Sequence, residues 1–486
     1  MLSIVILGGG SAGWMTAAAL AKANLCDTLE LTLIESPQVA TVGVGEATLP
    51  SIREFNHALG LEEEHFVSAT QATPKLGIEF TGWGGDEASY LHPFSSFGKD
   101  LEGIPFHKVW LWAKRRGYSK PFDAFSFLSH CCRESRFVHP GPELPPFDYA
   151  YHIDASLYAG VLESYAVKRG VDKVQGHVAH VRLDNETGSI KELLLEDGGR
   201  IRGDLFIDCS GFRSLLLGDA LTVPFVDWKK WLPCDRALAV RSRLGSGRQL
   251  YTRSIAGQAG WRWNIPLQNR CGNGVVYSSS HLSDEQALVE LTGGDTGVKE
   301  EDWLSEPKVI KFGAGVRQCQ WRRNCVAIGL SAGFLEPLES TSLSLIQIGI
   351  YTLLRCLPAT PDSVCEADYF NDIMQKEYEA ARDFVINHYA TNGAGQGDFW
   401  RECRETEPPD SLKEVFDLFK ATGTLPDKRF GFQALSWLAV MIGQGFYPDV
   451  DDRRLENRDY KSIKDRLDGL HKSYSKVVGE MAGNKR

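Results

Sequence analysis

Apolar residues near the start of the chain form a short continuous run, Ile4-Val5-Ile6-Leu7, which stops at a cluster of glycines. A run of this length that ends in a turn signal predicts a buried strand. From Trp14 to Ala23 small and apolar residues continue, which predicts a helix. A second apolar stretch, Leu29 to Ile34, closes in Glu35 and predicts a second strand. The chain therefore opens with a predicted βαβ unit.

The middle of the chain alternates between irregular and regular patterns. Leu91 to Asp148 is rich in aromatic residues, Pro and Gly and has little periodicity, which indicates an insertion over the first domain. Helical spacing returns at Asp154, where the apolar residues Leu157, Val161 and Tyr165 recur. Strand-like segments follow around Val181 and Leu193, and an Asp-Gly turn leads to a further strand at residues 205–208.

After Thr341 the pattern becomes helical. Leu343 to Leu357 and Asp362 to Tyr389 predict two helices, and a charged C-terminal helix is predicted with one apolar face. That face would carry Ile463, Leu467, Leu470 and Tyr474. We therefore expect an α/β protein with a Rossmann-like domain at residues 1–350, which includes the insertion at about 91–148, and a mainly helical domain at 351–486.

The glycine cluster at residues 8–13 has the G-x-G-x-x-G spacing of a dinucleotide-binding fingerprint. Its glycines permit a tight turn, close approach of the backbone to a pyrophosphate and close helix packing, while the amides at the helix start would face the phosphates. Glu35 follows at the spacing, roughly 20 residues, at which an acid can hydrogen-bond the adenosine ribose. A glycine turn without a ligand is the alternative, but it does not account for the preceding strand and the following acid. The residues assigned to the dinucleotide are Gly8, Gly10, Ser11, Ala12, Gly13 and Glu35.

Composition narrows the classes of function. The 486 residues include 53 Lys and Arg against 63 Asp and Glu, which gives a formal net charge of −10. An acidic chain argues against nucleic-acid binding, which needs a basic face, so we expect a small-molecule partner. The eleven cysteines show neither C-x-x-C pairs nor zinc-type spacing, so we expect no metal site, no disulfide framework and a cytoplasmic location. No segment supplies the roughly 18 unbroken apolar residues that a membrane-spanning helix needs.

Two ionisable residues lie in restricted chain environments. Lys75 follows Pro74, and a desolvated lysine can donate hydrogen bonds or act as a nucleophile, whereas a surface lysine reaching into water is the alternative. Glu339 lies two residues after Pro337, just before an expected helix. It could be no more than a helix N-terminal charge, worth about 0.3–1 kcal/mol. Both alternatives stay open on the residues alone.

Four segments in this order resemble the flavin-dependent halogenase family typified by tryptophan halogenases. They are Gly8-Gly9-Gly10-Ser11-Ala12-Gly13, Thr73-Pro74-Lys75-Leu76-Gly77-Ile78, Gly260-Trp261-Arg262-Trp263-Asn264-Ile265-Pro266 and Phe334-Leu335-Glu336-Pro337-Leu338-Glu339-Ser340-Thr341. The resemblance runs from Ile4 to about Pro448 and is weakest in the C-terminal third. It implies an FAD-binding domain of the aromatic hydroxylase type under a helical substrate domain. It also implies an enzyme that uses FADH2, dioxygen and a halide, chloride or bromide, to halogenate an aromatic ring.

The resemblance also implies roles for individual residues. Lys75 matches the family's lysine that guides or captures hypohalous acid, and Glu339 matches the active-site glutamate, which would stabilise a cationic ring intermediate. The amides of Thr341 and Ser342 would bind the halide, although the family often has glycine in place of Ser342. The remaining residues assigned to the flavin are Gly45, Ala47, Gly329 and Leu338. Gly45 and Ala47 belong to a glycine-rich segment that matches a strap over the flavin ring, for which an ordinary loop is the alternative.

Aromatic residues suggest the substrate class. In the family's tryptophan-binding members an indole lies between aromatic side chains, and His92 and Phe94 match the first wall, while Trp437 could supply the second. Buried core packing is the alternative for Trp437. The tyrosine pair that holds the amino-acid end of tryptophan is not visible between Gly431 and Gly445. We therefore expect an indole-like ring rather than free tryptophan as substrate.

The partners follow from the same resemblance. No second strand-linked glycine fingerprint for a nicotinamide cofactor is visible, so we expect a separate NAD(P)H-dependent flavin reductase to supply FADH2. The alternatives are an FAD-dependent aromatic monooxygenase and a non-catalytic FAD-binding protein. The oligomeric state stays open, with a homodimer as one option.

Overall fold

The computed structural model describes residues 1–24, 28–36, 45–85, 88–245, 248–293, 297–357, 364–393, 397–427 and 430–481. Contacts divide the chain into two compact units, each built from three separated segments. Unit 1 comprises Met1–Ala72, Ile153–Lys229 and Lys311–Glu379, and unit 2 comprises Thr73–His152, Lys230–Ile310 and Ala380–Arg486. The predicted division at residue 350 falls inside a helix of unit 1. As a statement about independently folding domains, it stays a prediction.

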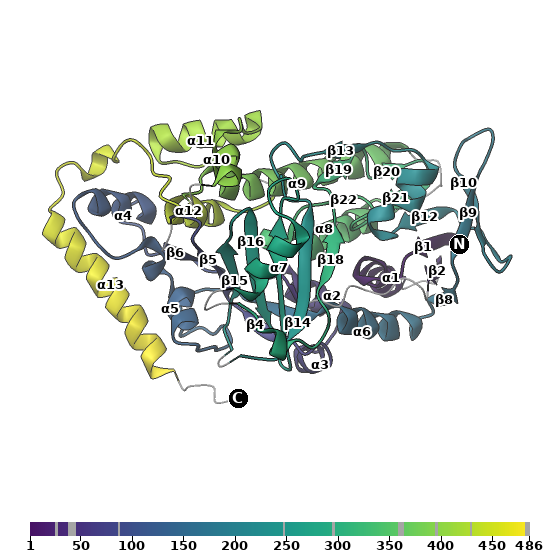
Figure 1. Ribbon diagram of the computed structural model, residues 1–486, viewed down its shortest axis with the longest axis horizontal. Coiled ribbons are helices and arrows are strands. Elements are labelled where there is room, and N and C mark those ends of the chain that lie inside the picture. Colours follow the sequence, from purple (N-terminus) through teal and green to yellow (C-terminus); the bar gives the residue numbers. More distant parts are fainter. Residues whose placement is uncertain are drawn as a thin grey trace. The chain divides into compact units, whose positions relative to one another are not determined.

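The largest sheet of unit 1 has six strands in the order β20-β21-β12-β1-β2-β8 (Figure 1). Their bounds are β1 (Leu2–Leu7), β2 (Leu29–Glu35), β8 (Asp172–Gln175), β12 (Leu205–Asp208), β20 (Trp321–Arg322) and β21 (Cys325–Ala327). β1 pairs in parallel with both β2 and β12, whereas β20 pairs antiparallel at the edge. Ile4, Val5 and Ile6 are fully buried, which explains why β1 is a continuous apolar run rather than an alternating one.

Helix α1 (Ser11–Ala23) packs against β1 and β2, as in Rossmann-like folds. Helices α6 (Ala155–Val167) and α8 (Thr341–Arg355) pack against α1. The predicted βαβ opening is confirmed as β1, α1 and β2, and the helices expected after Asp154 and Thr341 are confirmed as α6 and α8. The buried face of α6 includes Tyr158, Leu162 and Tyr165. Leu157 is exposed, so the predicted stripe was right for Tyr165 and wrong for Leu157.

Smaller elements complete unit 1. One three-stranded sheet contains β9 (Val178–Leu183), β10 (Ile190–Leu195) and β11 (Arg200–Ile201), and another contains β13 (Phe225–Asp227), β19 (Gly315–Arg317) and β22 (Gly333–Phe334). Further elements are β3 (Gly45–Ala47), α2 (Ser51–Leu59), α3 (Glu63–Ala69) and the 3-10 turn η5 (Pro337–Glu339). Helix α9 (Val364–Ala390) begins in unit 1 and ends in unit 2.

Unit 2 is organised by a seven-stranded sheet in the order β18-β14-β17-β16-β15-β5-β6. Its strands are β5 (Gly77–Thr81), β6 (Ser89–Pro93), β14 (Arg236–Ser242), β15 (Thr252–Ala256), β16 (Gly260–Pro266), β17 (Cys271–Tyr277) and β18 (Lys308–Lys311). A short strand, β4 (Thr73–Lys75), pairs antiparallel with β7 (Ala150–Asp154). The helices of unit 2 besides α9 are α4 (Phe106–Arg115), α5 (Phe127–Arg133), α7 (Asp284–Thr292), α10 (Asp398–Glu405), α11 (Asp410–Thr422), α12 (Ala434–Gly443) and α13 (Tyr460–Glu480).

The aromatic-rich segment 91–148 is more regular than its sequence suggests, because it contains α4 and α5. Six residues of α4 are buried, among them the consecutive residues from Val109 to Ala113. Consecutive positions lie on different sides of a helix, so α4 is enclosed from Val109 to Ala113, whereas Lys114 and Arg115 at its end are exposed. Phe106, Val109, Trp110 and Ala113 have the i, i+3, i+4, i+7 spacing of a helix, so this short stretch did carry a helical signal that the longer segment obscured.

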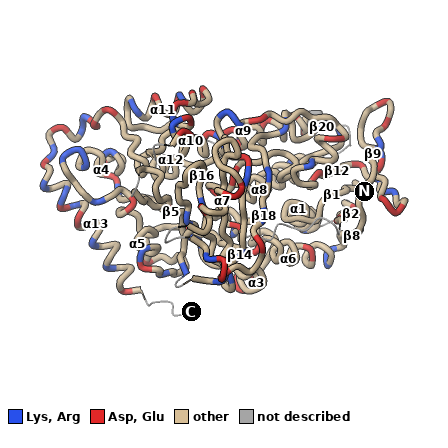
Figure 2. The backbone as a smooth tube through the Cα atoms, in the orientation of Figure 1, with Lys and Arg blue, Asp and Glu red and all other residues tan. Residues whose placement is uncertain are grey.

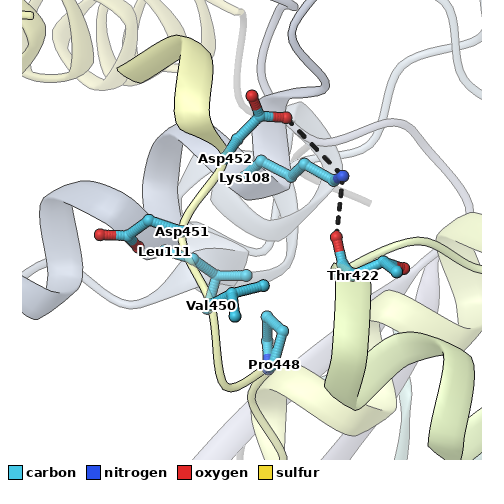
Figure 3. A pocket seen from close by; sticks show the side chains of 8 residues that line it. Lys108, Leu111, Thr422, Pro448, Val450, Asp451 and Asp452 are labelled. Carbon is cyan, nitrogen blue, oxygen red and sulfur yellow. Dashed lines mark hydrogen bonds and ion pairs between the residues drawn. The ribbon is translucent and has the colours of Figure 1, made fainter. Parts of the chain in front are cut away.

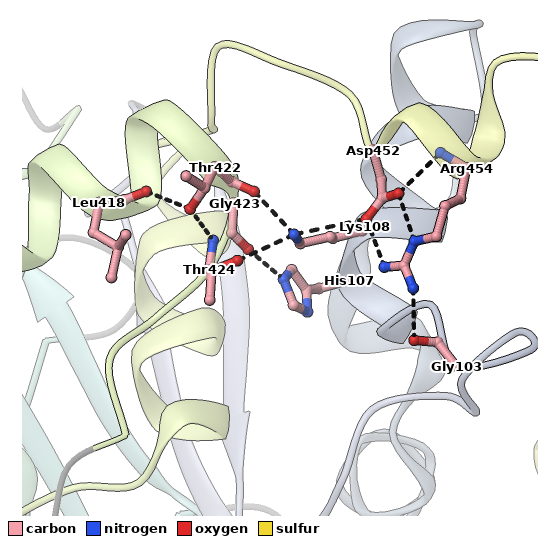
Figure 4. Close-up of polar contacts among 9 residues, drawn as sticks. All are labelled: Gly103, His107, Lys108, Leu418, Thr422, Gly423, Thr424, Asp452 and Arg454. Atoms are coloured by element: carbon pink, nitrogen blue, oxygen red, sulfur yellow. Dashed lines mark hydrogen bonds and ion pairs between the residues drawn. The ribbon is translucent and has the colours of Figure 1, made fainter.

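A polar junction joins α4, the end of α11 and residues 448–454. Lys108 Nζ donates to the Thr422 carbonyl (2.9 Å) and to Thr424 Oγ1 (3.1 Å) and forms an ion pair with Asp452 (3.7 Å), as Figure 4 shows. The adjacent hollow, lined partly by Pro448 and Val450, measures about 10 Å³ (Figure 3). That volume holds about one water molecule, so this hollow serves structure rather than substrate binding.

Charges of both signs are interspersed along the chain (Figure 2). None of the helices in the described ranges is both long enough and apolar enough to cross a bilayer.

Candidate active site

The glycine turn after β1 has a geometry that side chains would disrupt. Gly8 has a φ of +122°, and a Cβ there would overlap the carbonyl of Cys209, which follows β12. A Cβ on Gly13 would overlap the Gly8 carbonyl. These two glycines therefore hold the turn close to the neighbouring strand and to the start of α1.

The start of α1 is open where a ligand would lie. A Cβ on Gly10 would have no heavy atom within 4 Å, and no side chain caps the helix. The amides of Ser11 and Ala12 belong to the first turn, where backbone donors have no partner within the helix. This arrangement fits the pyrophosphate of FAD, which would bind at the positive end of α1.

Glu35 lies beside the glycine turn at the end of β2. A Cβ on Gly9 would lie 2.5 Å from Glu35 Cγ. The Glu35 side chain therefore occupies space that a side chain at residue 9 would need. Lys173 Nζ on β8 forms ion pairs with Glu35 (2.8 Å) and with Glu163 of α6 (2.5 Å). The same Nζ lies 5.6 Å from the ring centroid of Trp14 on α1. The predicted ribose acid is thus held by a lysine that links three elements of unit 1.

Other predicted flavin residues lie in unit 1. Gly329 has a φ of +86°, and a Cβ there would be 2.8 Å from Cβ of Ala12, so these two residues meet. Gly45 and Ala47 are buried in β3, and Leu338 is buried in η5. Of the glycine-rich segment at residues 43–48, Gly43 and Val44 lie outside the described residues.

Glu46, between Gly45 and Ala47, adds an ionisable group to this segment. Burial raises the pKa of the Glu46 carboxyl to about 7, so this side chain can hold a proton at neutral pH. It is a carboxyl that could exchange protons next to predicted cofactor residues.

The segment before α8 buries two carboxylates. Glu336 and Glu339 flank Pro337 and are both fully buried. Ser340 then adopts a left-handed conformation, with a φ of 59°, which turns the chain into α8. Thr341, predicted to bind halide, is buried at the first helical position, and its Oγ1 has no hydrogen-bond partner among the described residues.

The helix start therefore offers donors to an anion. No side chain caps α8, and Ser342 lies half-buried beside Thr341. A buried helix N-terminus with a free hydroxyl fits a small anion such as a halide.

Lys75 closes β4 in unit 2 and is fully buried. Its Nζ lies 5.2 Å from the ring centroid of Phe94, one of the predicted substrate residues. The Phe94 amide donates to the Leu76 carbonyl (2.9 Å), which fixes the two segments together. The alternative of a solvent-exposed lysine is wrong, because burial excludes it.

His92 and Trp437 meet in one aromatic cluster, which we define as His92, Phe384, Phe432 and Trp437. The Phe384 ring lies 6.0 Å from His92, 3.9 Å from Phe432 and 5.1 Å from Trp437 between centroids. Trp437 is 2% exposed, and its Nε1 donates to the Phe432 carbonyl (3.2 Å). The structure therefore brings two of the three predicted substrate residues to Phe384, while Phe94 lies beside Lys75.

Trp261 and Trp263 share one face of β16, as their spacing predicts. Their ring centroids are 6.1 Å apart, and both side chains are buried.

The predicted residues are divided between the units. The glycine fingerprint, Glu35, Glu339 and the predicted halide residues belong to unit 1, whereas Lys75 and the predicted substrate residues belong to unit 2. The pairing of Lys75 with Glu339 stays a prediction. Over the described ranges, no group of three or more His, Cys, Asp or Glu is placed to hold a metal ion.

Sequence reasoning missed four residues that now stand out: Glu46, Lys173, Phe384 and Phe432. Glu46 could have been found as the charged residue inside a glycine-rich segment. Lys173 and Phe384 gave no local signal, because their partners are distant in sequence.

Known proteins resemble the chain over almost its full length. The family model described as tryptophan halogenase matches residues 3–460. The 7-chloro-L-tryptophan 6-halogenase KtzR of Kutzneria sp. (strain 744) is 34% identical over 95% of this chain and 96% of that protein.

Solved structures agree with the fold. BrvH, a flavin-dependent halogenase from Brevundimonas sp. BAL3, is 43% identical with a TM-score of 0.94, covering 99% of this chain and 97% of that chain. The tryptophan 6-halogenase SttH from Streptomyces toxytricini is 32% identical with a TM-score of 0.90, covering 99% and 98%. Because the family model, the sequence identity and the fold agree along the chain, the protein belongs to the tryptophan halogenase family of flavin-dependent halogenases.

Proposed function

We propose that this FADH2-dependent halogenase acts on an indole-like aromatic ring, with Lys75 and Glu339 as its catalytic pair. The observation that carries the proposal is the complete burial of both side chains, each within a segment that matches the family. Moving a lysine or a carboxylate out of water costs several kcal/mol, so a protein keeps such groups buried where they have a function or a compensating partner.

FAD would be held by the glycine turn, the start of α1 and Glu35, for which the Cβ overlaps at Gly8 and Gly13 are the structural support. When bound in its reduced form, FAD would supply two of the four electrons that reduce dioxygen, and the halide would supply the other two as it becomes hypohalous acid, with water as the second product. The halide would bind at the amides of Thr341 and Ser342.

The protein's own groups would direct the halogen. The Lys75 ammonium would donate a hydrogen bond to the oxygen of hypohalous acid, which orients the halogen towards the ring. The halogen forms a bond to a ring carbon, its bond to oxygen breaks, and the oxygen takes up a proton to leave as water. The Glu339 carboxylate would stabilise the ring cation and accept the proton that the ring carbon loses.

The substrate is proposed to be indole or a simple derivative. His92, Phe94 and Trp437 supply aromatic rings of the kind that stack on an indole, whereas the tyrosine pair that would hold a zwitterion is not visible at residues 431–445. Burying the unpaired charges of free tryptophan would be costly. Chloride or bromide is proposed as the co-substrate.

The partner and setting complete the proposal. Flavin-dependent halogenases generally need a separate flavin reductase, and we propose an NAD(P)H-dependent one here. The ten described cysteines are free thiols, which fits a reducing cytoplasm. A homodimer is the assembly to test by light scattering.

The decisive experiment combines the protein, a flavin reductase, FAD and chloride or bromide with indole and tryptophan in competition, and identifies products by mass spectrometry. We expect halogenated indole in excess over halogenated tryptophan. A clear preference for tryptophan would refute the substrate proposal. NAD(P)H oxidation and ring hydroxylation by the protein without a reductase would favour a monooxygenase instead.

Variants test the catalytic pair. Lys75→Met and Glu339→Gln should each lower the halogenation rate by about 10²–10³, the usual effect of removing a preorganised charged group. Glu336→Gln is the matched control, because it alters the other buried carboxylate of the same segment. An equal loss in Glu336→Gln would mean that the effect of Glu339→Gln is structural.

A further inference from the structure

A buried histidine, His152, lies on β7, which pairs with the strand β4 that carries Lys75. In the pairing of β4 with β7, Thr73 is opposite His152 and Lys75 is opposite Ala150. His152 is fully buried, and both of its ring nitrogens face threonine hydroxyls. Nδ1 lies 3.2 Å from Thr73 Oγ1, and Nε2 lies 2.9 Å from Thr252 Oγ1 on β15.

The hydroxyl of Thr73 determines which ring nitrogen carries the proton. Thr73 Oγ1 donates its hydrogen to the Pro266 carbonyl at 2.6 Å, so towards His152 it can only accept. Nδ1 must therefore be the protonated nitrogen, and Nε2 of the neutral ring accepts from Thr252. This chain of hydrogen bonds also joins two family segments, because Thr73 precedes Lys75 and Pro266 ends the segment with Trp261 and Trp263.

The electrostatics agree with a neutral ring. Burial, and then the positive charge of Lys75, lower the pKa of His152 well below its usual value. Lys75 is the charged group that acts on His152 within the described part of the chain. A protonated ring would place a second positive charge beside the lysine in a dry environment.

We propose that His152 is a positioning residue for Lys75. We define the histidine cluster as Thr73, Lys75, His152 and Thr252. As a neutral ring held between the two threonines, His152 fixes β4 to β15 and β16. It also leaves Lys75 as the sole cation of the cluster. The inference rests on the proposed catalytic role of Lys75.

The first test measures the histidine directly and needs no turnover. Nitrogen-15 NMR of histidine-labelled protein, with the signal assigned by its loss in His152→Asn, should show the Nδ1-protonated neutral tautomer from pH 8 down through pH 6. Because the charges are coupled, Lys75→Met should raise the titration midpoint of His152. A charged ring at pH 7, or the same midpoint in both proteins, would overturn the proposal.

The second test measures position through kinetics. His152→Leu should lower kcat for indole by about 10- to 100-fold, the size of effect expected when a catalytic group is displaced. KM and the dissociation constant of FAD should change less than twofold. His152→Asn retains a donor towards Thr73 and should recover part of kcat, which a general packing role would not explain.

Thr252→Val covers the case in which His152→Leu does not fold, because it removes only the partner of Nε2. Ser254→Ala is its control on the same strand, since the Ser254 hydroxyl is buried and has no hydrogen-bond partner among the described residues. We expect a lower kcat in Thr252→Val and an unchanged kcat in Ser254→Ala. Full activity of Lys75→Met would refute the proposed function. If Lys75→Met is inactive but Thr252→Val and His152→Leu are fully active, only the role of His152 is refuted.

Discussion

Single residues set the geometry of the predicted FAD site. The sequence predicted Gly8, Gly10 and Gly13 because their spacing has a known physical reason. It did not predict that Gly9 is needed too, since the Glu35 side chain that occupies its space comes from the next strand. The sequence did not predict Lys173 either, because only the pairing of β8 with β2 brings its side chain close to Glu35.

Lys173→Met should weaken FAD binding by about two- to fivefold, because a half-exposed ion pair contributes about 0.2–1 kcal/mol. FMN lacks the adenosine ribose that Glu35 would bind, so its affinity should not change. Titration by flavin fluorescence measures both ligands, and Glu163→Gln, which leaves the Glu35 ion pair in place, is the control. A parallel loss of FMN affinity would show that the mutation disturbs the unit as a whole.

Elements pack through contacts that the sequence pattern revealed in part. The apolar face predicted for the C-terminal helix is confirmed for Ile463, Leu467 and Tyr474 of α13, which are buried, whereas Leu470 is only half-buried. The pattern could not show that α13 places His471 against His130 of α5, with ring centroids 5.0 Å apart.

Acid should weaken the contact of α13 with α5. Burial lowers the pKa of His130 and that of His471, and His130 lowers the latter further. Arg133 and Lys120 act in the same direction, while Asp123, Glu134 and Asp468 oppose them. Since the folded-state pKa values lie below the unfolded value of about 6.5, the unfolded chain binds more protons, and stability falls as the pH drops below about 6.5.

Thermal unfolding between pH 7.5 and 5.5 measures this effect. His471→Phe should lose part of the acid sensitivity, whereas His65→Gln, at an exposed position on α3, should retain all of it. Identical pH profiles for wild type and His471→Phe would contradict the prediction.

The polar junction at the end of α11 gives a second prediction at this scale. Lys108→Met removes two hydrogen bonds and an ion pair, so it should lower the free energy of unfolding by about 1–2 kcal/mol. Lys413→Met removes an exposed ion pair and should change it by less than about 1 kcal/mol. Urea unfolding followed by circular dichroism compares them, and equal effects would refute a special role for Lys108.

At the scale of the molecule, local patterns predicted the Rossmann-like beginning and the helical end, because βαβ units and amphipathic helices are encoded over short stretches. The aromatic cluster around Phe384 was not predictable, since its members come from distant parts of the sequence, whereas α4 was missed although its apolar residues have helical spacing. The interleaved units were not predictable either, because they arise from pairings between segments that are distant in sequence, such as that of Ile4 with Leu205.

FAD should stabilise the folded protein through unit 1. At a free concentration of 100 times its dissociation constant, a ligand adds about 2.7 kcal/mol to the free energy of unfolding. Hydrogen exchange should slow most at residues 8–13 and around Glu35. Protection by FAD that leaves both regions unchanged would mean that the flavin binds elsewhere.

The interleaving of the two units has a consequence for synthesis on the ribosome. β1 meets β2 almost at once, but its other neighbour, β12, follows roughly 200 residues later, which at 5–20 residues per second is a delay of about 10–40 s. β21 and α8 come later still. During that time the apolar edge of β1 has no partner on one side, so the nascent chain needs protection from aggregation, and a fragment ending near residue 200 should be a client of chaperones rather than a stable flavin-binding protein.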